Sequence, residues 1–535
     1  MSFLNLKKAG LFRFDEGDER FELTETEHGA PRGMTGFPEA ERSGEGITRD
    51  SVPRSVGEAY EKLKLMFRAD INKDVIMRRF LIGGRHEALL VYMNGMADDR
   101  KINDFILRPL MTASVRRITA DTLLNEVIEI AEAVKKTELG EVALDVTDGV
   151  TALFIDGETE CVCLETRGYE KRAVGETSNE KVVRGPKEGF TESARTNITL
   201  IRRIIHTDDL VAEFRSSGGS NLTRTALVYR EGTADPRLVN EVKRRLARVA
   251  APAVTSSGIP EQFIEDSGLS PLPQILATER PDRAASHIMQ GRVCLIVEGS
   301  PSALIMPVTL FTLMNSPEDV YMRRPLGTVL RLVRYIGALV SVLLPGYFLA
   351  LALYHQGVLS TEVLSTVIAS RRMVFEPIGV EILLLLLIFQ MIREAGLRVP
   401  GDIGQAIGII GGLIMGQAAV AAHLASSVVL IIVAVSGLGN FCIPDYSTQI
   451  AASYLRVAMV IAAWMGGLLG MVSTALLACC LLASMKSFGV PFLAPFAPKT
   501  YSKRPFVVRG RIGRHRRADD YANTADDRKV GENAK

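Results

Sequence analysis

One long stretch of the chain is almost free of charge, and this feature limits the possible folds more than any other. From Tyr335 to Met485, 151 residues carry only 11 Asp, Glu, Lys and Arg side chains, although charged residues make up 23% of the whole chain. Roughly 20 apolar residues span the hydrocarbon core of a bilayer, so the uncharged runs in this block predict membrane helices. The sequence therefore excludes a purely soluble protein.

Four apolar runs divide this block, at 333–354, 378–392, 403–435 and 457–485. The second run has 15 residues and is short for a span, whereas the third has 33 uncharged residues, too long for one simple pass and short for two. We therefore expect a break, an interfacial stretch or a re-entrant hairpin near 421–427. Pro345 is expected to kink the first run.

The distribution of Lys and Arg predicts the orientation. Four arginines between 323 and 334 precede the first run, and eight Lys and Arg between 499 and 517 follow the last run, with no acid among them. By the positive-inside rule, both ends face the cytoplasm, which requires an even number of passes. We expect four; five passes, which would export the basic tail, are the alternative. The charged first 40 residues lack the apolar core of a signal peptide, so we expect the N-terminal part to stay cytoplasmic.

The N-terminal half predicts an α/β fold. Helical and strand patterns alternate from 56 to 320 and predict two mixed α/β subdomains, each with its own sheet. A hairpin pattern at 151–164, with Asp156 and Gly157 at its turn, recurs at 291–306, and residues 123–134 predict an amphipathic helix. The expected division is a disordered extension (1–55), subdomains at 56–175 and 176–320, a polytopic α-helical membrane domain (321–490), and a basic cytoplasmic tail (491–535).

The third apolar run contains a series of glycines that share a spacing of four, with one more beside them. They are Gly404, Gly408, Gly411, Gly412 and Gly416. Such a stripe lets another backbone approach closely, either within the chain or from sister copies around a central axis. Gly466 and Gly470 offer a second, weaker stripe. In a ring of copies, the opposite side of the helix would present Ile410, Ile414 and Gln417 to a lumen, as candidates for a pore or gate.

Ionisable residues in this block leave alternatives open. Glu381, in the second run, is either a functional group at a pore mouth or an interfacial carboxylate at a helix start. Asp445 lies either at a vestibule or in a solvated loop. The group of Arg393, Glu394 and Arg398 is expected in a cytoplasmic loop that fixes the topology rather than in a substrate site.

Signatures of catalysis are absent from the sequence. There is no Gly-rich phosphate loop, the histidines are scattered, and Cys161 and Cys163 on an apolar strand are expected to fill a core rather than bind a metal. We therefore expect no catalytic residues, no metal and no cofactor. The basic tail is expected to meet anionic lipid rather than nucleic acid.

Several short motifs occur together and in order along the chain. They are Phe80-x-Ile-Gly-Gly84, Ile102-Asn-x-x-Ile106-Leu-x-Pro-Leu110, Arg184-Gly-Pro-Lys-Glu-Gly-Phe-Thr-Glu192, Pro273-Gln-x-x-x-x-Thr278-Glu-Arg-Pro-Asp282, Gly291-Arg-Val with Gly299-Ser-Pro301, Glu318-Asp-x-Tyr321 and Arg393-Glu-Ala-Gly-Leu-Arg-x-Pro400. Over roughly 56–498, the chain thereby resembles the A subunit of GerA-type spore germination receptors.

This resemblance implies a receptor in the inner membrane of the spore that works with B and C subunits. In that family, the B subunit is thought to bind the nutrient, and copies of the A subunit are proposed to assemble into a nutrient-gated cation channel. Two other functions stay open from the residues: a secondary transporter, because Pro345 and the broken third run are typical of discontinuous helices, and a non-conducting scaffold. The nutrient is not predicted.

Overall fold

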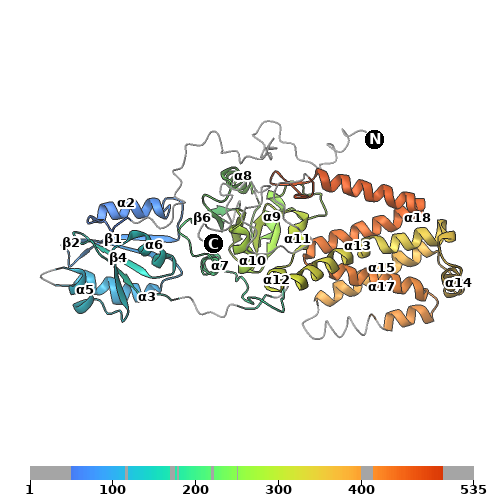
Figure 1. Cartoon of the computed structure of the whole chain (residues 1–535), viewed down its shortest axis with the longest axis horizontal. Helices are drawn as coiled ribbons and strands as arrows, with labels where there is room; N and C mark the ends of the chain where they lie inside the picture. The colour runs from blue at the N-terminus through green and yellow to red at the C-terminus, as the bar shows by residue number, and fades with distance from the viewer. Residues whose placement is uncertain are drawn as a thin grey trace.

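The structure is a computed structural model that describes residues 50–114, 118–168, 175–177, 180–218, 222–249, 251–398, 412 and 414–497. It is elongated, with one α/β subdomain at one end, a second in the middle and a bundle of helices at the other end (Figure 1). The expected N-terminal extension, up to residue 49, and the basic stretch from 499 onward lie outside the described residues.

Subdomain 1 (residues 50–168) is built on a five-stranded antiparallel sheet of order β1-β2-β4-β5-β3. Its elements are α2 (Val56–Met66), β1 (Val75–Ile82), β2 (His86–Met93), α3 (Asp99–Lys101), the π-helix η1 (Ile102–Leu107), α4 (Arg108–Thr112), α5 (Ala120–Glu126), β3 (Ala133–Lys136), α6 (Leu139–Thr147), β4 (Thr151–Ile155) and β5 (Cys161–Leu164). Helices α2 and α6 cover one face, and η1, α4 and α5 cover the other. Each face therefore buries its own apolar core.

Subdomain 2 (residues 180–315) has a second five-stranded antiparallel sheet, of order β6-β7-β9-β10-β8. Its elements are α7 (Ala194–Arg202), β6 (Leu210–Ser217), β7 (Thr223–Arg230), α8 (Pro236–Leu246), α9 (Gly258–Ile264), β8 (Leu276–Thr278), α10 (Pro281–Ile288), β9 (Val293–Val297), β10 (Ala303–Met306) and α11 (Leu310–Met314). Helices α7 and α10 pack on one face, and α8 and α9 on the other.

The two predicted hairpins, β4–β5 and β9–β10, are confirmed. Gly157 and Gly299 at their turns have φ of +91° and +84°, a conformation that favours glycine. The predicted helix over 123–134 is wrong beyond Glu126. Residues Ala133–Lys136 form the edge strand β3, because pairing with β5 and packing against the core outweigh the helical period.

The bundle follows subdomain 2. It contains α12 (Glu318–Tyr321), α13 (Arg324–Tyr354), η2 (Gln356–Val358), α14 (Thr361–Ser370), α15 (Ile378–Arg398), α17 (Ser427–Phe441) and α18 (Tyr446–Ser484). Residues 414–421 are also helical, and a turn at 422–426, with His423 at φ +55°, separates them from α17. The break expected near 421–427 is therefore confirmed.

Helix α18 is bent back on itself. Gly466 and Gly467 have non-helical backbone angles, and a Cβ added to Gly470 would lie 2.2 Å from the carbonyl oxygen of Ala462. Residues eight apart in a straight helix are about 12 Å apart, so the chain must reverse here. We name residues 446–465 the outgoing arm and 467–484 the returning arm (Figure 1). The last apolar run is thus part of a helical hairpin and not one straight helix.

The C-terminal end of the bundle returns to subdomain 2. A short hairpin, β11 (Lys486–Ser487) and β12 (Val490–Pro491), follows α18, and the fully buried Phe488 and Phe492 join the two cores of subdomain 2. The expected boundaries at 490 and 491 therefore need correction. The stretch 486–497 packs on subdomain 2, because its aromatic side chains bury apolar area there.

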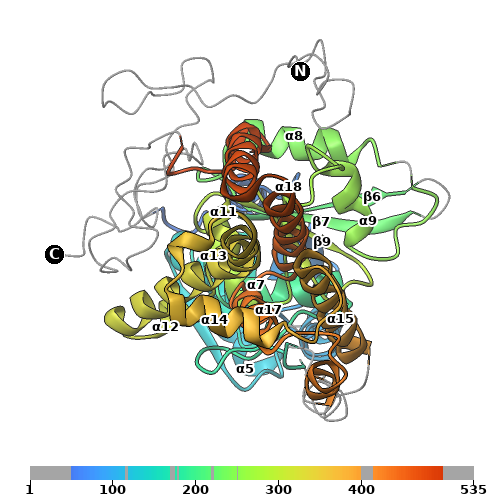
Figure 2. The same cartoon turned by 90° about the vertical axis from the view of Figure 1, so that its right-hand side faces the viewer.

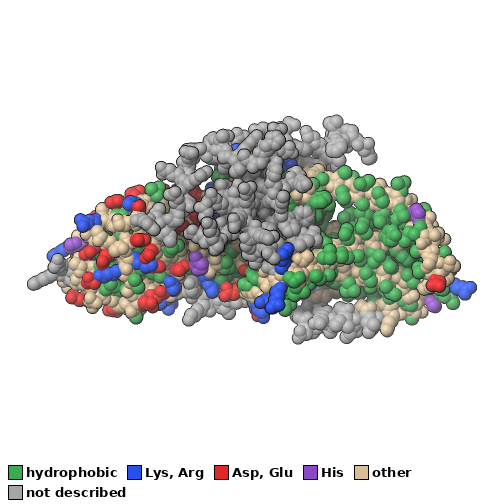
Figure 3. Space-filling view, in the orientation of Figure 1, with side chains coloured by type: hydrophobic (Ala, Val, Ile, Leu, Met, Phe, Trp, Pro, Cys, Tyr) green, Lys and Arg blue, Asp and Glu red, His purple; other side chains and the backbone are tan. Residues whose placement is uncertain are grey.

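The outer surface of the bundle is apolar. Figure 2 looks at the bundle end, where the helices lie side by side around α13, and Figure 3 shows hydrophobic side chains over most of the visible bundle surface. Subdomain 1 instead shows mixed charges in the same view. Two helices of the described chain, α13 and α18, are long and apolar enough to cross a membrane.

Candidate functional site at the junction of subdomain 2 and the bundle

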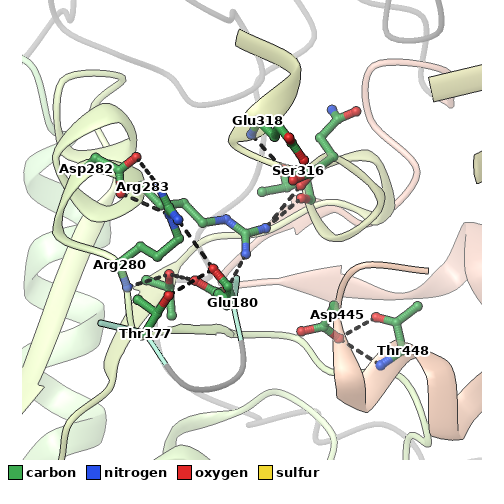
Figure 4. Close-up of polar contacts among 12 residues, drawn as sticks. Thr177, Glu180, Arg280, Asp282, Arg283, Ser316, Glu318, Asp445 and Thr448 are labelled. Atoms are coloured by element: carbon green, nitrogen blue, oxygen red, sulfur yellow. Dashed lines mark hydrogen bonds and ion pairs between the residues drawn. The ribbon is translucent and has the colours of Figure 1, made fainter. Parts of the chain in front are cut away.

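The junction contains a deeply buried arginine at the start of α10. Arg280 is fully buried, and its guanidinium bonds both carboxylate oxygens of Asp282, with Nε–Oδ1 at 3.1 Å and Nη2–Oδ2 at 2.9 Å (Figure 4). It also donates to the carbonyl oxygens of Glu180 and Pro186. The motifs around 184–192 and 273–282, far apart in the sequence, are therefore held together by one charged side chain.

Glu180 and Arg283 extend this network toward the bundle. Glu180 Oε1 pairs with Arg283 Nη1 at 2.7 Å, and Oε2 accepts a 2.6 Å hydrogen bond from the hydroxyl of Thr278 (Figure 4). Arg283 Nη2 also donates to the carbonyl oxygens of Thr312 and Asn315, just before α12. The helix α10 is thus tied to the segment that leads into the bundle.

Tyr321 joins α12 to the same carboxylate. Its hydroxyl donates to Asp282 Oδ2 at 2.6 Å, and burial together with this hydrogen bond raises the pKa of the Tyr321 hydroxyl. Its ring lies against Gly185, where an added Cβ would be 2.7 Å from ring atom Cδ2 and where φ is +132°. This close approach explains the glycine in the Arg184–Glu192 motif, and it brings three of the family motifs to one place.

Asp319 anchors the first turns of α13. This carboxylate is fully buried and accepts from Arg331 Nε at 2.9 Å and from both Nη atoms of Arg334, at 3.0 and 2.9 Å. Arg331 and Arg334, read in the sequence as topological signals, therefore also fix the angle between α12 and α13. Bidentate pairing gives this contact a defined geometry.

The end of the returning arm is fixed to the same subdomain. The backbone N–H of Phe488 donates to Asp266 Oδ2 at 2.6 Å, and the hydroxyl of Ser487 donates to the carbonyl oxygen of Gln274 at 2.7 Å. Arg245 stacks on the Phe488 ring, 4.4 Å from its centroid. Subdomain 2 therefore holds both the first and the last helix of the bundle, so a displacement of this subdomain acts on both.

The sequence marked the motifs of this junction but assigned them no role. The signal was present, because charged residues recur in the segments 180–192, 278–283 and 318–334. The ion pairs between these charged residues join positions as far as 103 residues apart, as in Glu180 and Arg283. The local periodicity of the sequence does not predict such long-range contacts.

The glycine stripe lies only partly within the described residues. Gly404, Gly408, Ile410 and Gly411 lie outside them. A Cβ added to Gly412 would meet no atom within 4 Å, and one added to Gly416 would lie 3.5 Å from Leu430. Ile414 is 58% exposed and Gln417 is also exposed, so within one copy of the chain this helical segment is open on one side.

Gly466 and Gly470, predicted as a second stripe, do not lie along one face of a straight helix. Gly466 lies at the turn of α18 with φ of −137°, and Gly470 packs against Ala462 of the outgoing arm. Both glycines therefore serve the hairpin within one chain.

Both carboxylate oxygens of Glu381 have partners inside the bundle. It is 1% exposed; Oε1 accepts from the N–H and the hydroxyl of Ser426 at 2.6 and 2.7 Å, and Oε2 lies 3.2 Å from Arg371 Nε. The carboxylate thus joins the turn before α17 to the start of α15. This geometry corresponds to a structural carboxylate at a helix start.

Two further residues singled out from the sequence have defined places. Asp445 is the N-cap of α18 and accepts from the N–H and the hydroxyl of Thr448 (Figure 4). Arg393 does not lie in a loop: it belongs to α15 and is buried. The loop expected there is wrong, because α15 continues to Arg398. Within the described ranges, no group of three or more His, Cys, Asp and Glu side chains is arranged to hold a metal ion.

Comparison with known proteins gives one consistent answer. Residues 61–520 match the family model described as Bacillus/Clostridium GerA spore germination protein. The spore germination protein GerLA of Bacillus cereus is 34% identical over 439 residues, which cover 81% of this chain and 89% of that protein. The spore germination protein KA of Bacillus subtilis (strain 168) is 33% identical over 431 residues, 80% of this chain and 79% of that protein.

Two further similarities concern the membrane and the soluble half. The uncharacterized membrane protein YfkQ of Bacillus subtilis (strain 168) is 32% identical over 426 residues, 79% of this chain and 83% of that protein. The crystal structure of the N-terminal domain of the A subunit of the Bacillus megaterium spore germinant receptor GerK3 covers 48% of this chain and 96% of that chain, with 27% identity and a TM-score of 0.37.

Proposed function

The chain belongs to the Bacillus/Clostridium GerA family of spore germination proteins, and on this premise we propose that it transmits a nutrient signal by opening an ion pathway formed by several copies. It would do so as the A subunit of a receptor in the inner spore membrane. The nutrient would bind to the B subunit, and a C subunit would complete the receptor. The observation that carries this proposal is the junction, in which subdomain 2 holds both ends of the helical bundle.

The arrangement of helices supports a multi-pass topology with both ends cytoplasmic. Glu381 at the start of α15 contacts Ser426 at the start of α17, and Phe389 near the middle of α15 contacts Phe441 at the end of α17. Helices α15 and α17 therefore run parallel. Because subdomain 2 holds both the start of α13 and the end of the returning arm, the two ends of the bundle lie on one side, which supports an even number of passes, as expected from the sequence. We propose that both ends face the cytoplasm, because Arg and Lys residues gather next to the first and the last apolar run.

Self-association is proposed to use the side of the bundle that is open within one copy. Gly412 and Ile414 lie on a helical segment with free space around the glycine and an exposed isoleucine. A glycine stripe facing a sister copy allows close backbone contact, and Ile410, Ile414 and Gln417 would then line the ion pathway. The basic tail after Lys499 would hold the cytoplasmic ends near anionic lipid.

The test is ion release from spores and single-channel recording of the purified receptor. We expect Gly412→Leu to abolish assembly and the nutrient response, and Ile410→Ala or Ile414→Ala to cause ion leak without nutrient. Gly357→Leu is the matched control, because Gly357 also has no atom within 4 Å but lies in η2, outside the stripe. Normal nutrient-triggered release in the Gly412, Ile410 and Ile414 variants would refute the proposed pathway, and a complex that never conducts would favour a scaffold.

A further inference from the structure

Two arginines inside the bundle face each other without an acidic partner. Arg393 of α15 is 9% exposed and Arg456 of the outgoing arm is 2% exposed, and the two side chains are close enough for their charges to repel. In the part of the chain that the structure describes, neither forms an ion pair with a carboxylate. Among the described residues, Nε of both arginines and Nη2 of Arg393 have no hydrogen-bond partner.

The groups around these arginines are neutral. Arg456 donates to the hydroxyls of Ser436 and Ser453 at 3.2 and 3.4 Å, and Arg393 Nη1 lies 2.8 Å from the amide oxygen of Asn440 in the orientation that satisfies that amide. Serine and asparagine accept hydrogen bonds but supply no negative charge. The two positive charges therefore lack compensation.

Three other buried arginines of the same chain do have that compensation. Arg202 faces Asp74 at 3.0 Å, Arg280 faces Asp282 at 2.9 Å, and Arg283 faces Glu180 at 2.7 Å. A buried charge without a partner is strongly unfavourable, and more so between apolar helices than in a soluble domain. The bundle contains two such charges side by side, so the arrangement requires a counter-charge from outside the described chain.

We propose that Arg393 and Arg456 form a binding site for a small monovalent anion between α15 and the outgoing arm of α18. The anion would accept from the unpartnered Nε and Nη2 atoms, which are fixed in a planar fork suited to a halide or to a single carboxylate group. The hydroxyl of Ser341, buried and unpartnered, adds a rotatable donor next to Ser436. The occupied site would join α15, α17 and α18.

The proposal is tested on the purified full-length chain, and it does not depend on whether the chain conducts ions. Trp464 is the single tryptophan of the chain and packs against Gly379 in the bundle, so its fluorescence reports unfolding of the bundle. Unfolding temperatures are measured in sodium chloride, sodium acetate and sodium gluconate at equal ionic strength. Chloride and acetate separate a halide site from a carboxylate site, and gluconate is too bulky for a close-packed bundle.

We expect chloride or acetate to raise the unfolding temperature by about 2–4 °C relative to gluconate, with saturation as the concentration rises. The double variant Arg393→Gln/Arg456→Gln should lose this shift and unfold in gluconate no earlier than the parent, because it has lost an uncompensated repulsion. Arg372→Gln, which changes an exposed arginine at the far end of the bundle, should keep the shift.

Three results would overturn the site. They are equal unfolding temperatures in all three salts, a shift that the double variant retains, or a double variant that is less stable than the parent in gluconate. The last result would mean that the guanidinium groups are already compensated. Should the double variant not fold, Arg456→Lys keeps the charge and loses the fork, and an unchanged shift in that variant would also contradict the assignment.

Discussion

The two α/β subdomains have one fold but different tasks. In each, the strands follow the order first, second, fourth, fifth, third, and strand lengths agree closely, with 8 residues in β1, β2, β6 and β7 and 5 in β4 and β9. Subdomain 1 lies at the free end of the molecule, whereas subdomain 2 carries the helical bundle (Figure 1). The comparison therefore shows which features allow a subdomain to hold the helical bundle.

The main difference lies at the start of the helix that follows the third strand. In subdomain 1, α6 follows β3 and has the exposed Glu138 at its N-cap. In subdomain 2, α10 follows β8 and has the fully buried Arg280 at the same position. A buried charge pair has a defined geometry, and loss of one partner strongly destabilises the fold because the other charge stays buried without compensation. The same scaffold becomes a connector when this position is charged, buried and paired.

The largest effect is expected from removal of this buried arginine. Arg280→Ala leaves Asp282 buried beside the Tyr321 hydroxyl and should lower the free energy of unfolding by about 3–5 kcal/mol. It should also uncouple the nutrient signal from ion release. Denaturant unfolding of the full chain measures the first effect. Glu138→Ala, at the matching position of subdomain 1, should change stability by less than about 0.5 kcal/mol. Equal losses in both variants would show that the two positions are equivalent.

The joint between the subdomains is expected to be the next most sensitive. Arg202 on α7 pairs with the buried Asp74 at 3.0 Å and also donates to the side chain of Asn72 at 3.3 Å. Burial raises the pKa of Asp74, and Arg202 opposes that rise. Without the arginine, the carboxyl can take up a proton, so Arg202→Ala should cost about 3 kcal/mol at neutral pH and less in acid.

The pH dependence of the stability lost in Arg202→Ala tests whether the pair with Asp74 causes the loss. Because the Asp74 pKa would rise further in Arg202→Ala, the difference from the parent should shrink as pH falls. Proteolysis between the subdomains should accelerate in parallel. A loss that is the same at about pH 5 and about pH 8 would mean that Asp74 does not change its protonation state over this range, and would contradict the expected pH dependence.

The local signals in the sequence were enough for much of each subdomain. Turn residues such as Asp156 and Gly157, flanked by apolar runs of strand length, predicted the hairpins, because a tight turn determines how the adjacent strands pair. The local signals did not predict the strand at residues 133–136. This segment becomes a strand because it pairs with β5, whose residues lie 25 or more positions further along the chain. The N-terminal half was thus predictable where contacts are local.

The candidate site and the bundle were less predictable for the same reason. Gly466 and Gly467 in an apolar run are compatible with a packed straight helix or with a turn, and only the contact of Gly470 with Ala462 distinguishes them. Phe488 and Phe492 join subdomain 2 only because the returning arm brings them there. The burial of Arg393 depends on residues of two other helices, Asn440 of α17 and Arg456 of α18, so no local signal in the sequence contradicted its expected place in a loop.

A smaller effect is expected from the tyrosine of the junction. Tyr321→Phe removes one hydrogen bond to a carboxylate and should lower the free energy of unfolding by about 2 kcal/mol, with a weaker nutrient response. Tyr335→Phe is the matched control, because the Tyr335 hydroxyl is buried and has no hydrogen-bond partner among the described residues. That variant should be as stable as the parent or slightly more stable. If both variants lose the same amount, the bond to Asp282 is not the cause.

The smallest effect concerns pH and again distinguishes the two subdomains. On α5 of subdomain 1, Asp121 pairs with Lys135. On the corresponding α9 of subdomain 2, burial and the nearby Glu265 and Asp445 raise the pKa of Glu261 to about 7. Burial and the nearby Asp266 raise the pKa of Glu265, just after α9, to about 7 as well.

A raised carboxyl pKa means that the folded state holds its proton more tightly than the unfolded chain does. The contribution of Glu261 to stability is therefore full below the ordinary pKa of about 4.5 and is lost as pH rises toward 7. Because the side chain is partly exposed and water screens its charge, we expect a loss of only about 1 kcal/mol between about pH 5 and about pH 8.

Glu261→Gln should flatten this dependence in denaturant unfolding of the full chain, whereas Asp121→Asn in subdomain 1 should leave it unchanged. A parent whose stability rises with pH over this range would show that these carboxylates are compensated by positive charge.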